Sequence, residues 1–301
     1  MAGLCDGRVA IVTGAGRGLG RAHALAFARA GAKVVVNDLG VAPDGSGADR
    51  SPAQEVVDEI RGSGGEAIAD ASDVADFEQA GRLVRAALDA FGRLDVVVNN
   101  AGFVRDRMFV SCSEEEWDAV VRVHLRGHFC VSRRACDHWR AEAKAGRPVD
   151  ARIVNTSSGA GLQGSVGQSA YSAAKAGIAA LTLVQAAELG RYGITANAIA
   201  PSARTRMTEG PFAEMMKKPA RGFDAMDPGN VSPLVVWLGS AESREVTGQV
   251  FEVAGGLISV ADGWRTGPRF DKGARFEPDE IGPVVRDLLA KAVPPQKVYG
   301  A

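Results

Sequence analysis

The sequence has few of the features that mark a secreted, metal-binding or nucleic-acid-binding protein. It has four cysteines, Cys5, Cys112, Cys130 and Cys136. They lack the paired spacing of a metal site or of a disulfide framework. We therefore expect reduced thiols, no bound metal and a cytoplasmic location. The formal net charge is -1, whereas a dedicated nucleic-acid binder usually carries a basic excess, so no nucleic-acid partner is expected.

Long apolar runs are also missing. The sequence has no apolar stretch of about 18 residues or more and no charged-then-apolar leader, so we expect neither membrane insertion nor secretion. No linker rich in proline, serine or glycine divides the chain before residue 262. The 301 residues are enough for one large domain, which we place at residues 1–261. Residues 262–301 are interpreted as an extension, with a helix predicted at 278–291, that acts as a lid or interface arm or is disordered.

What the sequence does contain is a regular alternation of two patterns. Short runs rich in β-branched residues alternate with amphipathic helical stretches. The runs lie at residues 9–12, 33–37, 67–69, 94–98, 152–155, 194–199 and 249–253. This alternation predicts an α/β fold, a doubly wound, Rossmann-type parallel sheet of about seven strands with helices on both faces. Ligands in such sheets bind beyond the carboxyl ends of the strands, where the strand order reverses.

The first run leads into a turn that is rich in glycine, Thr13-Gly-Ala-Gly-Arg-Gly-Leu-Gly20. Glycines at this spacing permit a tight turn, a close backbone approach to a pyrophosphate and close packing of helix on sheet. Free amides at the start of the following helix then face the anion. The predicted cofactor-binding residues here are Gly14, Gly16, Arg17, Gly18, Leu19 and Gly20. A strand-to-helix turn without any ligand is the alternative.

The end of the second run indicates which dinucleotide is bound. Asp38 follows Gly20 at about the spacing at which a carboxylate accepts hydrogen bonds from an adenosine ribose and repels a 2′-phosphate. Arg17 argues in the other direction, because a guanidinium in the glycine turn could reach a 2′-phosphate. A fixed carboxylate outweighs a flexible arginine, and we therefore predict NAD.

Two further run ends are polar. Asp73, followed by Val74, could accept a hydrogen bond from the adenine amino group, or it could cap a helix predicted at residues 77–90. The sequence Asn99-Asn-Ala-Gly102 ends the fourth run, and its small residues let the backbone pass close to the cofactor. We expect Asn100, Ala101 and Gly102 to line the cofactor groove, while Asn99 can be purely structural.

The residues that point to a reaction are Ser158, Tyr171 and Lys175. Tyr171 and Lys175 are four apart in a stretch predicted as helix, so both project from one face. Ser158 follows the fifth run and so lies at the same sheet edge. A free tyrosine has a pKa of about 10, but a neighbouring ammonium and a positive nicotinamide ring would stabilise the phenolate as a general base. Lys175 could also hold the nicotinamide ribose, and Ser158 could orient the reacting oxygen.

Together these motifs resemble the short-chain dehydrogenase/reductase family over about residues 6–260. The match rests on Thr-Gly-x3-Gly-x-Gly, Asn-Asn-Ala-Gly, the serine and Tyr-x3-Lys. The resemblance implies that Thr205 hydrogen-bonds the nicotinamide carboxamide, although Pro201-Ser202 replaces the usual Pro-Gly. It also implies self-association, as a homodimer or homotetramer, through helices predicted at residues 113–140 and 170–191.

His124 departs from the family pattern. Most of the family has an asparagine there, which supports a water of the proton relay. A neutral imidazole could hold that water as a catalytic relay member, or it could be a structural histidine. Both interpretations are open at this stage.

Several stretches resemble one branch of the family more closely, the (3R)-hydroxyacyl-CoA dehydrogenase domains of type 2 peroxisomal multifunctional enzymes. They include residues 36–40, the loop at 41–50, residues 100–107 and 123–127 and the region around Trp264. This resemblance implies NAD-linked oxidation of a 3-hydroxyacyl-CoA, fatty or sterol, in β-oxidation. Arginines and lysines near the cleft could meet the CoA phosphates: Arg105, Arg107, Arg204, Arg206, Lys217, Lys218 and Arg221.

Three other functions remain as alternatives. A 17β-hydroxysteroid dehydrogenase acting on a free steroid would use the same catalytic residues. A 3-oxoacyl-carrier-protein reductase is disfavoured by Asp38, since that step uses NADPH. A protein that only senses NAD or acts as a scaffold would have no use for Tyr171 as a base.

Overall fold

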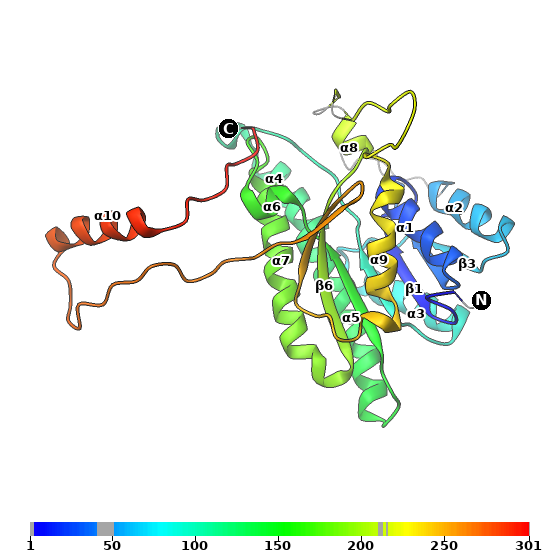
Figure 1. The fold of residues 1–301 in the computed structure, drawn as a ribbon. Coiled ribbons are helices and arrows are strands. Elements are labelled where there is room, and N and C mark those ends of the chain that lie inside the picture. Colours follow the sequence, from blue (N-terminus) through cyan, green and yellow to red (C-terminus); the bar gives the residue numbers. More distant parts are fainter. Residues whose placement is uncertain (1–2, 41–50, 210–212, 215, 301) are drawn as a thin grey trace.

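The computed structural model describes residues 3–40, 51–209, 213–214 and 216–300. The loop at 41–50 lies outside them. Within these residues one sheet of eight strands has the order β3-β2-β1-β4-β5-β6-β7-β8 (Figure 1). The strands are β1 (Val9–Thr13), β2 (Lys33–Asn37), β3 (Ala67–Asp70), β4 (Val96–Asn99), β5 (Ala151–Thr156), β6 (Ile194–Ser202), β7 (Val250–Ala254) and β8 (Leu257–Val260). The predicted doubly wound α/β fold is confirmed.

The sheet differs from the predicted one at a single edge. Strands β1 to β7 are parallel, but β8 pairs with β7 in antiparallel register, Ala254 opposite Leu257. Gly255 and Gly256 form the two-residue connection, and Gly255 has a φ of +55°, which glycine adopts without strain. The prediction of about seven strands therefore missed a hairpin partner of the last one.

Helices cover both faces of the sheet because alternate strand residues point to opposite sides. Val12 and Val98 belong to one core and Ile11 and Val97 to the other, and all four are fully buried. The first core lies under α1 (Gly18–Arg29), α2 (Ser51–Gly62) and α9 (Ser232–Gly239). The second lies under α3 (Phe77–Phe91), α5 (Gly127–Lys144) and α7 (Ser169–Leu189).

The helix predicted over residues 113–140 consists of three segments. A capping box between Ser113 and Glu116 starts α4 (Glu114–Val121), which continues through a π-helical turn, η2 (Arg122–Arg126), into α5. Such turns are common at functional sites, and η2 contains His124. The remaining short helices are α6 (Gly159–Gln163), α8 (Arg206–Glu209) and the 3-10 turns η1 (Phe109–Ser111), η3 (Gly190–Tyr192), η4 (Pro228–Asn230), η5 (Ala241–Ser243) and η6 (Pro278–Glu280).

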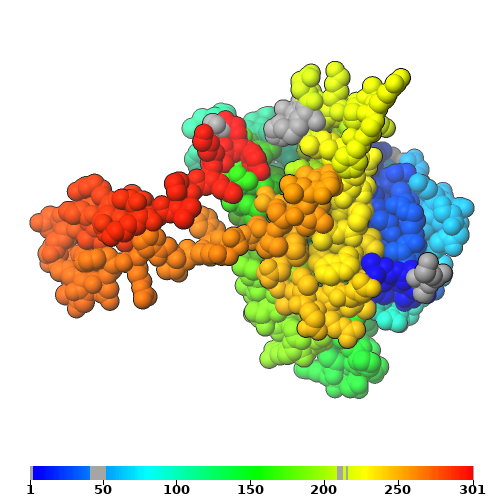
Figure 2. Space-filling view, viewed as in Figure 1, coloured from blue at the N-terminus to red at the C-terminus, as the bar shows by residue number. Residues whose placement is uncertain are grey.

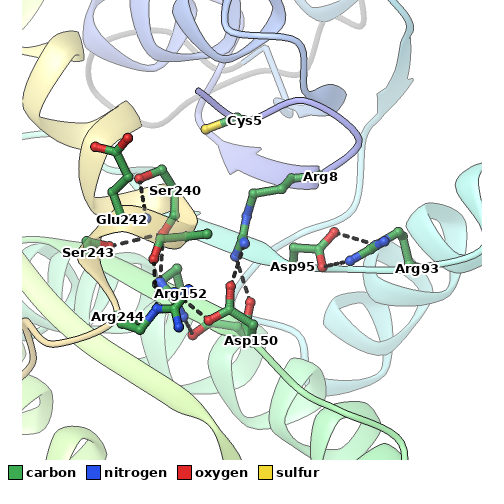
Figure 3. A network of polar contacts seen from close by, with 12 residues as sticks. Cys5, Arg8, Arg93, Asp95, Asp150, Arg152, Ser240, Glu242, Ser243 and Arg244 are labelled. Carbon is green, nitrogen blue, oxygen red and sulfur yellow. Dashed lines mark hydrogen bonds and ion pairs between the residues drawn. The ribbon is translucent and has the colours of Figure 1, made fainter. Parts of the chain in front are cut away.

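An ionic network of two buried arginines and the exposed Asp150 joins the strands at their amino ends, away from the edge where the sequence places the site (Figure 3). The Asp150 carboxylate accepts from Arg8 Nη1 at 2.8 Å and from Arg152 Nη2 at 2.5 Å. Arg152 is 1% exposed, and its Nε donates to the Ser240 carbonyl at 2.9 Å. The carboxylate and the carbonyl satisfy the buried guanidinium, so the network links β5 to the segment before β1 and to the end of α9.

Residues 262–297 leave the sheet and stand away from the rest of the molecule as an arm (Figures 1 and 2). The arm carries α10 (Ile281–Lys291), which with η6 covers the predicted helix at 278–291. Every hydrogen bond and ion pair of the described residues 262–297 joins two residues of that stretch, such as Lys272 and Glu280. The chain then returns to the body, where Tyr299 bridges to Ser165.

Candidate active site

The strand order reverses between β1 and β4, and a cavity of about 370 Å³ opens beyond their carboxyl ends. Most of the residues predicted to bind a cofactor line this first cavity: Gly14, Arg17, Gly18, Leu19, Asp38, Asp73, Val74, Asn100, Ala101, Gly102 and Thr205. Gly16 and Gly20 do not line it. Gly16 N instead binds Asp38, and Gly20 packs against the Gly14 carbonyl. The residues that follow the apolar runs in the sequence therefore meet around one cavity, as predicted.

Two glycines of the turn, Gly14 and Gly20, are packed too closely for a side chain. Gly14 has a φ of +61°, and a Cβ on it would lie 2.7 Å from Ala101 Cα. A Cβ on Gly20 would lie 2.1 Å from the Gly14 carbonyl oxygen, so α1 can approach the turn only with glycine there. Asn100 Nδ2 donates to the Thr13 and Gly14 carbonyls at 3.0 and 3.2 Å and holds the turn against β4.

The start of α1 suits an anion. Arg17 occupies the N-cap position without any side-chain hydrogen bond to the helix, and the first turn contains no acidic residue. The first amides of α1 therefore have no capping side chain and face the first cavity, as a phosphate group requires. A dinucleotide's pyrophosphate fits this donor set.

Asp38 is held rigidly at the wall of the first cavity. Gly16 N donates to its Oδ2 at 2.8 Å, and Gly40 N donates to its Oδ1 at 2.6 Å. Each carboxylate oxygen has further lone pairs, which can accept from ribose hydroxyls. Arg17 is exposed to solvent. Asp38 is therefore held in place at the cavity wall, and Arg17 lies exposed beside it.

Asp73 is not the cap of α3, and that interpretation was wrong. Asp76 takes the cap, accepting from Gln79 N at 2.8 Å, because the helix starts at Phe77 and the capping residue directly precedes it. Asp73 instead accepts from Ala75 N at 2.9 Å and from Arg122 at 2.6 Å, and it borders the first cavity.

Asn99 is buried and structural. Its Nδ2 donates to Ser132 Oγ at 2.8 Å and to Asn155 Oδ1 at 2.9 Å. Asn155 in turn donates to Thr182 and Gln185 on α7. This chain of amides fixes the ends of β4 and β5 and the helix that carries Tyr171.

A second cavity, of about 220 Å³, adjoins the first, since Leu19, Asn100, Gly102, Thr205 and Met207 line both. All four predicted catalytic residues line it: His124, Ser158, Tyr171 and Lys175. Only Tyr171 and Lys175 share a helix, so the topology of the sheet brings the others to them.

Helix α7 is locked onto the end of β5. Ser157 Oγ donates to the Lys175 carbonyl at 2.8 Å, and Lys175 Nζ donates to the Thr156 carbonyl at 2.6 Å. A Cβ on Gly161 would lie 2.6 Å from the carbonyl carbon of Lys175, so α6 packs directly on α7. Ser158 caps α6 by accepting from Ala160 N at 3.2 Å. These contacts fix the positions of Ser158 and Lys175 relative to each other.

Burial dominates the electrostatics of the second cavity. It raises the pKa of Tyr171, which a hydrogen bond with Ser158 partly offsets, and it lowers the pKa of Lys175 to about 7. The lysine Nζ lies 5.5 Å from the centre of the tyrosine ring. Burial disfavours both the phenolate and the ammonium and outweighs their mutual attraction here. That the ammonium and a positive nicotinamide ring together stabilise the phenolate stays a prediction.

His124 is buried in η2 at the wall of the second cavity. Its ring meets the Tyr171 ring edge-on, with centroids 5.2 Å apart. Burial lowers the pKa of His124 to about 3, so the imidazole is neutral. Its Nδ1 atom has no hydrogen-bond partner among the described residues.

The cations expected around the substrate are mostly placed elsewhere. Arg204 is ion-paired with Asp224 and also donates to the Met216 carbonyl. Both charged side chains of this pair are nearly buried. Arg206 lines the first cavity, and Arg107 pairs with Glu116 at 3.1 Å. Among the described residues, none of the seven lines the second cavity. Tyr299, which the sequence did not indicate, does line it.

A doubly wound sheet with an anion-binding glycine turn and a Ser-Tyr-Lys cluster at its carboxyl edge defines an oxidoreductase with a nicotinamide cofactor. The chain belongs to the short-chain dehydrogenase family, whose profile, described as "short chain dehydrogenase", matches residues 8–215. The part of the chain that the structure describes has no helix long and apolar enough to cross a membrane.

Three relatives place the chain within this family. A crystal structure of a short chain dehydrogenase from Mycobacterium avium is 66% identical and superimposes with a TM-score of 0.90 over 99% of this chain and 100% of that one. Hydroxyacyl-CoA dehydrogenase ChsB1 of Mycobacterium tuberculosis is 47% identical over 97% of this chain and 91% of its own. Peroxisomal multifunctional enzyme type 2 of Mus musculus is 49% identical over 84% of this chain and 32% of that protein. The predicted family and its hydroxyacyl-CoA branch are confirmed as resemblances.

Proposed function

We propose that this protein oxidises a (3R)-3-hydroxyacyl-CoA to the 3-oxoacyl-CoA with NAD, as a step of β-oxidation of a fatty or sterol side chain. This proposal rests on one observation: His124, Ser158, Tyr171 and Lys175 line the second cavity, which adjoins the first cavity. Similarity to a hydroxyacyl-CoA dehydrogenase over 97% of the chain supports the substrate class.

Tyr171, Ser158 and Lys175 have separate roles in the proposed reaction. Tyr171 takes the hydroxyl proton as general base, and Ser158 holds the reacting oxygen beside it. Lys175, fixed by its bond to the Thr156 carbonyl, can reach the nicotinamide ribose and the phenol from the same helix face. NAD, when bound, would accept the hydride from the alcohol carbon.

The preference for NAD rests on Asp38 and its two backbone donors. A carboxylate held at the ribose position favours hydroxyls and repels a 2′-phosphate. The first amides of α1 would hold the pyrophosphate, Asp73 and Val74 would border the adenine, and Thr205 would hold the carboxamide.

A panel of substrates tests this function. We expect NAD reduction with (3R)-3-hydroxyacyl-CoAs, little with the (3S) isomers, and little with a free 17β-hydroxysteroid. Turnover of the free steroid alone would instead identify a hydroxysteroid dehydrogenase. A strong preference for NADPH with carrier-protein thioesters would identify a reductase.

We also propose that the protein forms a homodimer or homotetramer through α5 and α7. Both helices keep large apolar side chains exposed, Phe129 on α5 and Leu183 and Val184 on α7, each about half accessible. Exposed apolar groups on long helices are typical of association surfaces. Light scattering is expected to give a mass two or four times that of the 31.3 kDa chain, and Leu183→Glu is expected to reduce it.

A further inference from the structure

Residues 298–300, which we call the strap, return from the arm and lie along the loop at residues 164–166. Val166 N donates to the Tyr299 carbonyl at 2.9 Å, and Tyr299 N donates to the Gly164 carbonyl at 3.2 Å. These bonds form a short parallel bridge between Tyr299 and Ser165. Because both bonds involve the backbone of Tyr299, they fix where its side chain leaves the strap.

The Tyr299 side chain lies against the residue that follows Ser158. A Cβ on Gly159 would lie 2.8 Å from Tyr299 Oη and 3.0 Å from its Cε2, so the ring covers bare glycine backbone. Gln163 Nε2 donates to Tyr299 Oη at 2.9 Å. Tyr299 is 46% exposed and also lines the second cavity, so it stands at the mouth of that cavity.

The second cavity is suited to an uncharged group. Among its described lining residues Lys175 is the only charged side chain, and Lys175 is already bonded to the Thr156 carbonyl. Away from the catalytic residues the wall includes apolar Val104, Met207 and Met216. Among the described lining residues a CoA phosphate would find no cation besides Lys175, whereas an acyl chain would find apolar walls.

We propose that Tyr299 is a specificity-determining residue whose ring forms the outer wall against which the acyl group of the substrate packs. This inference rests on the proposed function and names the part of the substrate that the second cavity holds. The strap follows the arm in the sequence and places the Tyr299 ring in contact with Gly159, the residue next to Ser158. Acyl groups too short to reach the mouth of the cavity do not contact it.

A purely structural role gives a different kinetic result. Tyr299 contacts Gly159 and Gln163, and both belong to α6, which Ser158 caps. If the strap only braced α6, its loss would displace Ser158 and lower kcat for every substrate alike. A wall for the acyl group acts instead on the KM of long or branched substrates.

The test compares a short and a bulky 3-hydroxyacyl-CoA in four proteins: unmodified, Tyr299→Ala, Tyr299→Phe and Gln163→Ala. Tyr299→Ala is expected to raise the KM of the bulky substrate about tenfold and to leave kcat and the short substrate's KM within about twofold. Tyr299→Phe and Gln163→Ala keep the ring and are expected to behave like the unmodified protein. An equal loss of kcat for both substrates, or no change in either KM, would overturn the proposal.

Failure of the proposed function is visible separately, in the unmodified protein. If that protein oxidises neither acyl-CoA, the same variants are compared on the small and bulky alcohols that it does oxidise. Hydrogen exchange adds a readout that needs no substrate. Removal of residues 298–301 is expected to speed exchange of the Val166 amide, and unchanged exchange would overturn the docking of the strap and the proposal with it.

Discussion

The Nε2 atom of His124 lies 2.7 Å from the carbonyl oxygen of Phe103. A carbonyl can only accept, so this short contact requires the ring proton on Nε2 and leaves Nδ1 as an acceptor. The Phe103 amide, 3.1 Å from the same Nε2, is then not its donor. The acceptor Nδ1 is buried at the wall of the second cavity and finds no partner in the described part of the chain, and an unmet buried acceptor is costly. We infer that Nδ1 holds a relay water.

His124→Phe keeps an aromatic ring at this position and removes both nitrogens. If Nδ1 holds a water that carries the proton from Tyr171, kcat is expected to fall about tenfold or more, while the Kd for NAD stays unchanged. Stopped-flow turnover and fluorescence titration measure the two quantities. Full kcat at every pH would show that His124 is a structural histidine.

Asp38→Asn tests the choice of cofactor. The amide keeps the size of the side chain and one oxygen acceptor but removes the charge that repels a 2′-phosphate. We expect kcat/KM for NADP to rise relative to NAD by about tenfold, which corresponds to about 1.4 kcal/mol. Asp58→Asn, on the exposed face of α2, is the matched control and is expected to change nothing. An unchanged ratio in Asp38→Asn would refute the role of the carboxylate.

The pKa of Tyr171 can be measured directly. Burial raises it above the ordinary value of 10.0, so without added coenzyme the phenol is expected to titrate above pH 10. The ultraviolet difference between the unmodified protein and Tyr171→Phe isolates this titration. Adding NAD, whose nicotinamide ring is positive, is expected to lower the midpoint. A midpoint below 10 without coenzyme would mean that Lys175 outweighs burial.

Buried histidines predict acid sensitivity of the fold. Burial lowers the pKa of His23 from 6.5 to about 3, and His124 and His128 shift the same way. As the pH falls from 6.5 toward 3, the unfolded chain binds protons at these positions that the folded chain does not, so stability is lost. His23→Gln can keep the hydrogen bond to Ser232 Oγ but removes the titrating group. The free energy of unfolding is then expected to fall less between pH 7 and pH 5, by up to about 2 kcal/mol. Urea denaturation at both pH values measures this free energy. The same decrease in His23→Gln and in the unmodified protein would contradict the prediction.

Local patterns predicted the sheet and the cofactor side of the site. Each parallel strand is an apolar run long enough to be recognised, and polar residues at run ends such as Asp38 and Asn100 must meet at one edge. The spacing of Tyr171 and Lys175 needed only the geometry of one helix. The strands, the residues at their ends and the spacing of Tyr171 and Lys175 all depend on neighbours close in sequence or on the sheet topology.

Features that depend on packing between distant segments were not predictable in this way. The π-helical turn at His124 and the strap at Tyr299 have no pattern of their own in the sequence. The pKa of Tyr171 depends on total burial, which a spacing of four residues does not report. Strand β8 is a different case, because the Gly255-Gly256 pair between apolar runs is a hairpin signal that could have been recognised.

The central claim is that the phenol of Tyr171 is the base that removes the hydroxyl proton. Tyr171→Phe keeps the ring against His124 and removes only the hydroxyl, and Tyr192→Phe in η3 is the matched control. We predict that Tyr171→Phe lowers kcat for 3-hydroxyacyl-CoA oxidation by about 10²–10⁴-fold while the Kd for NAD is retained, and that the control is unaffected. Undiminished oxidation by Tyr171→Phe would contradict the account.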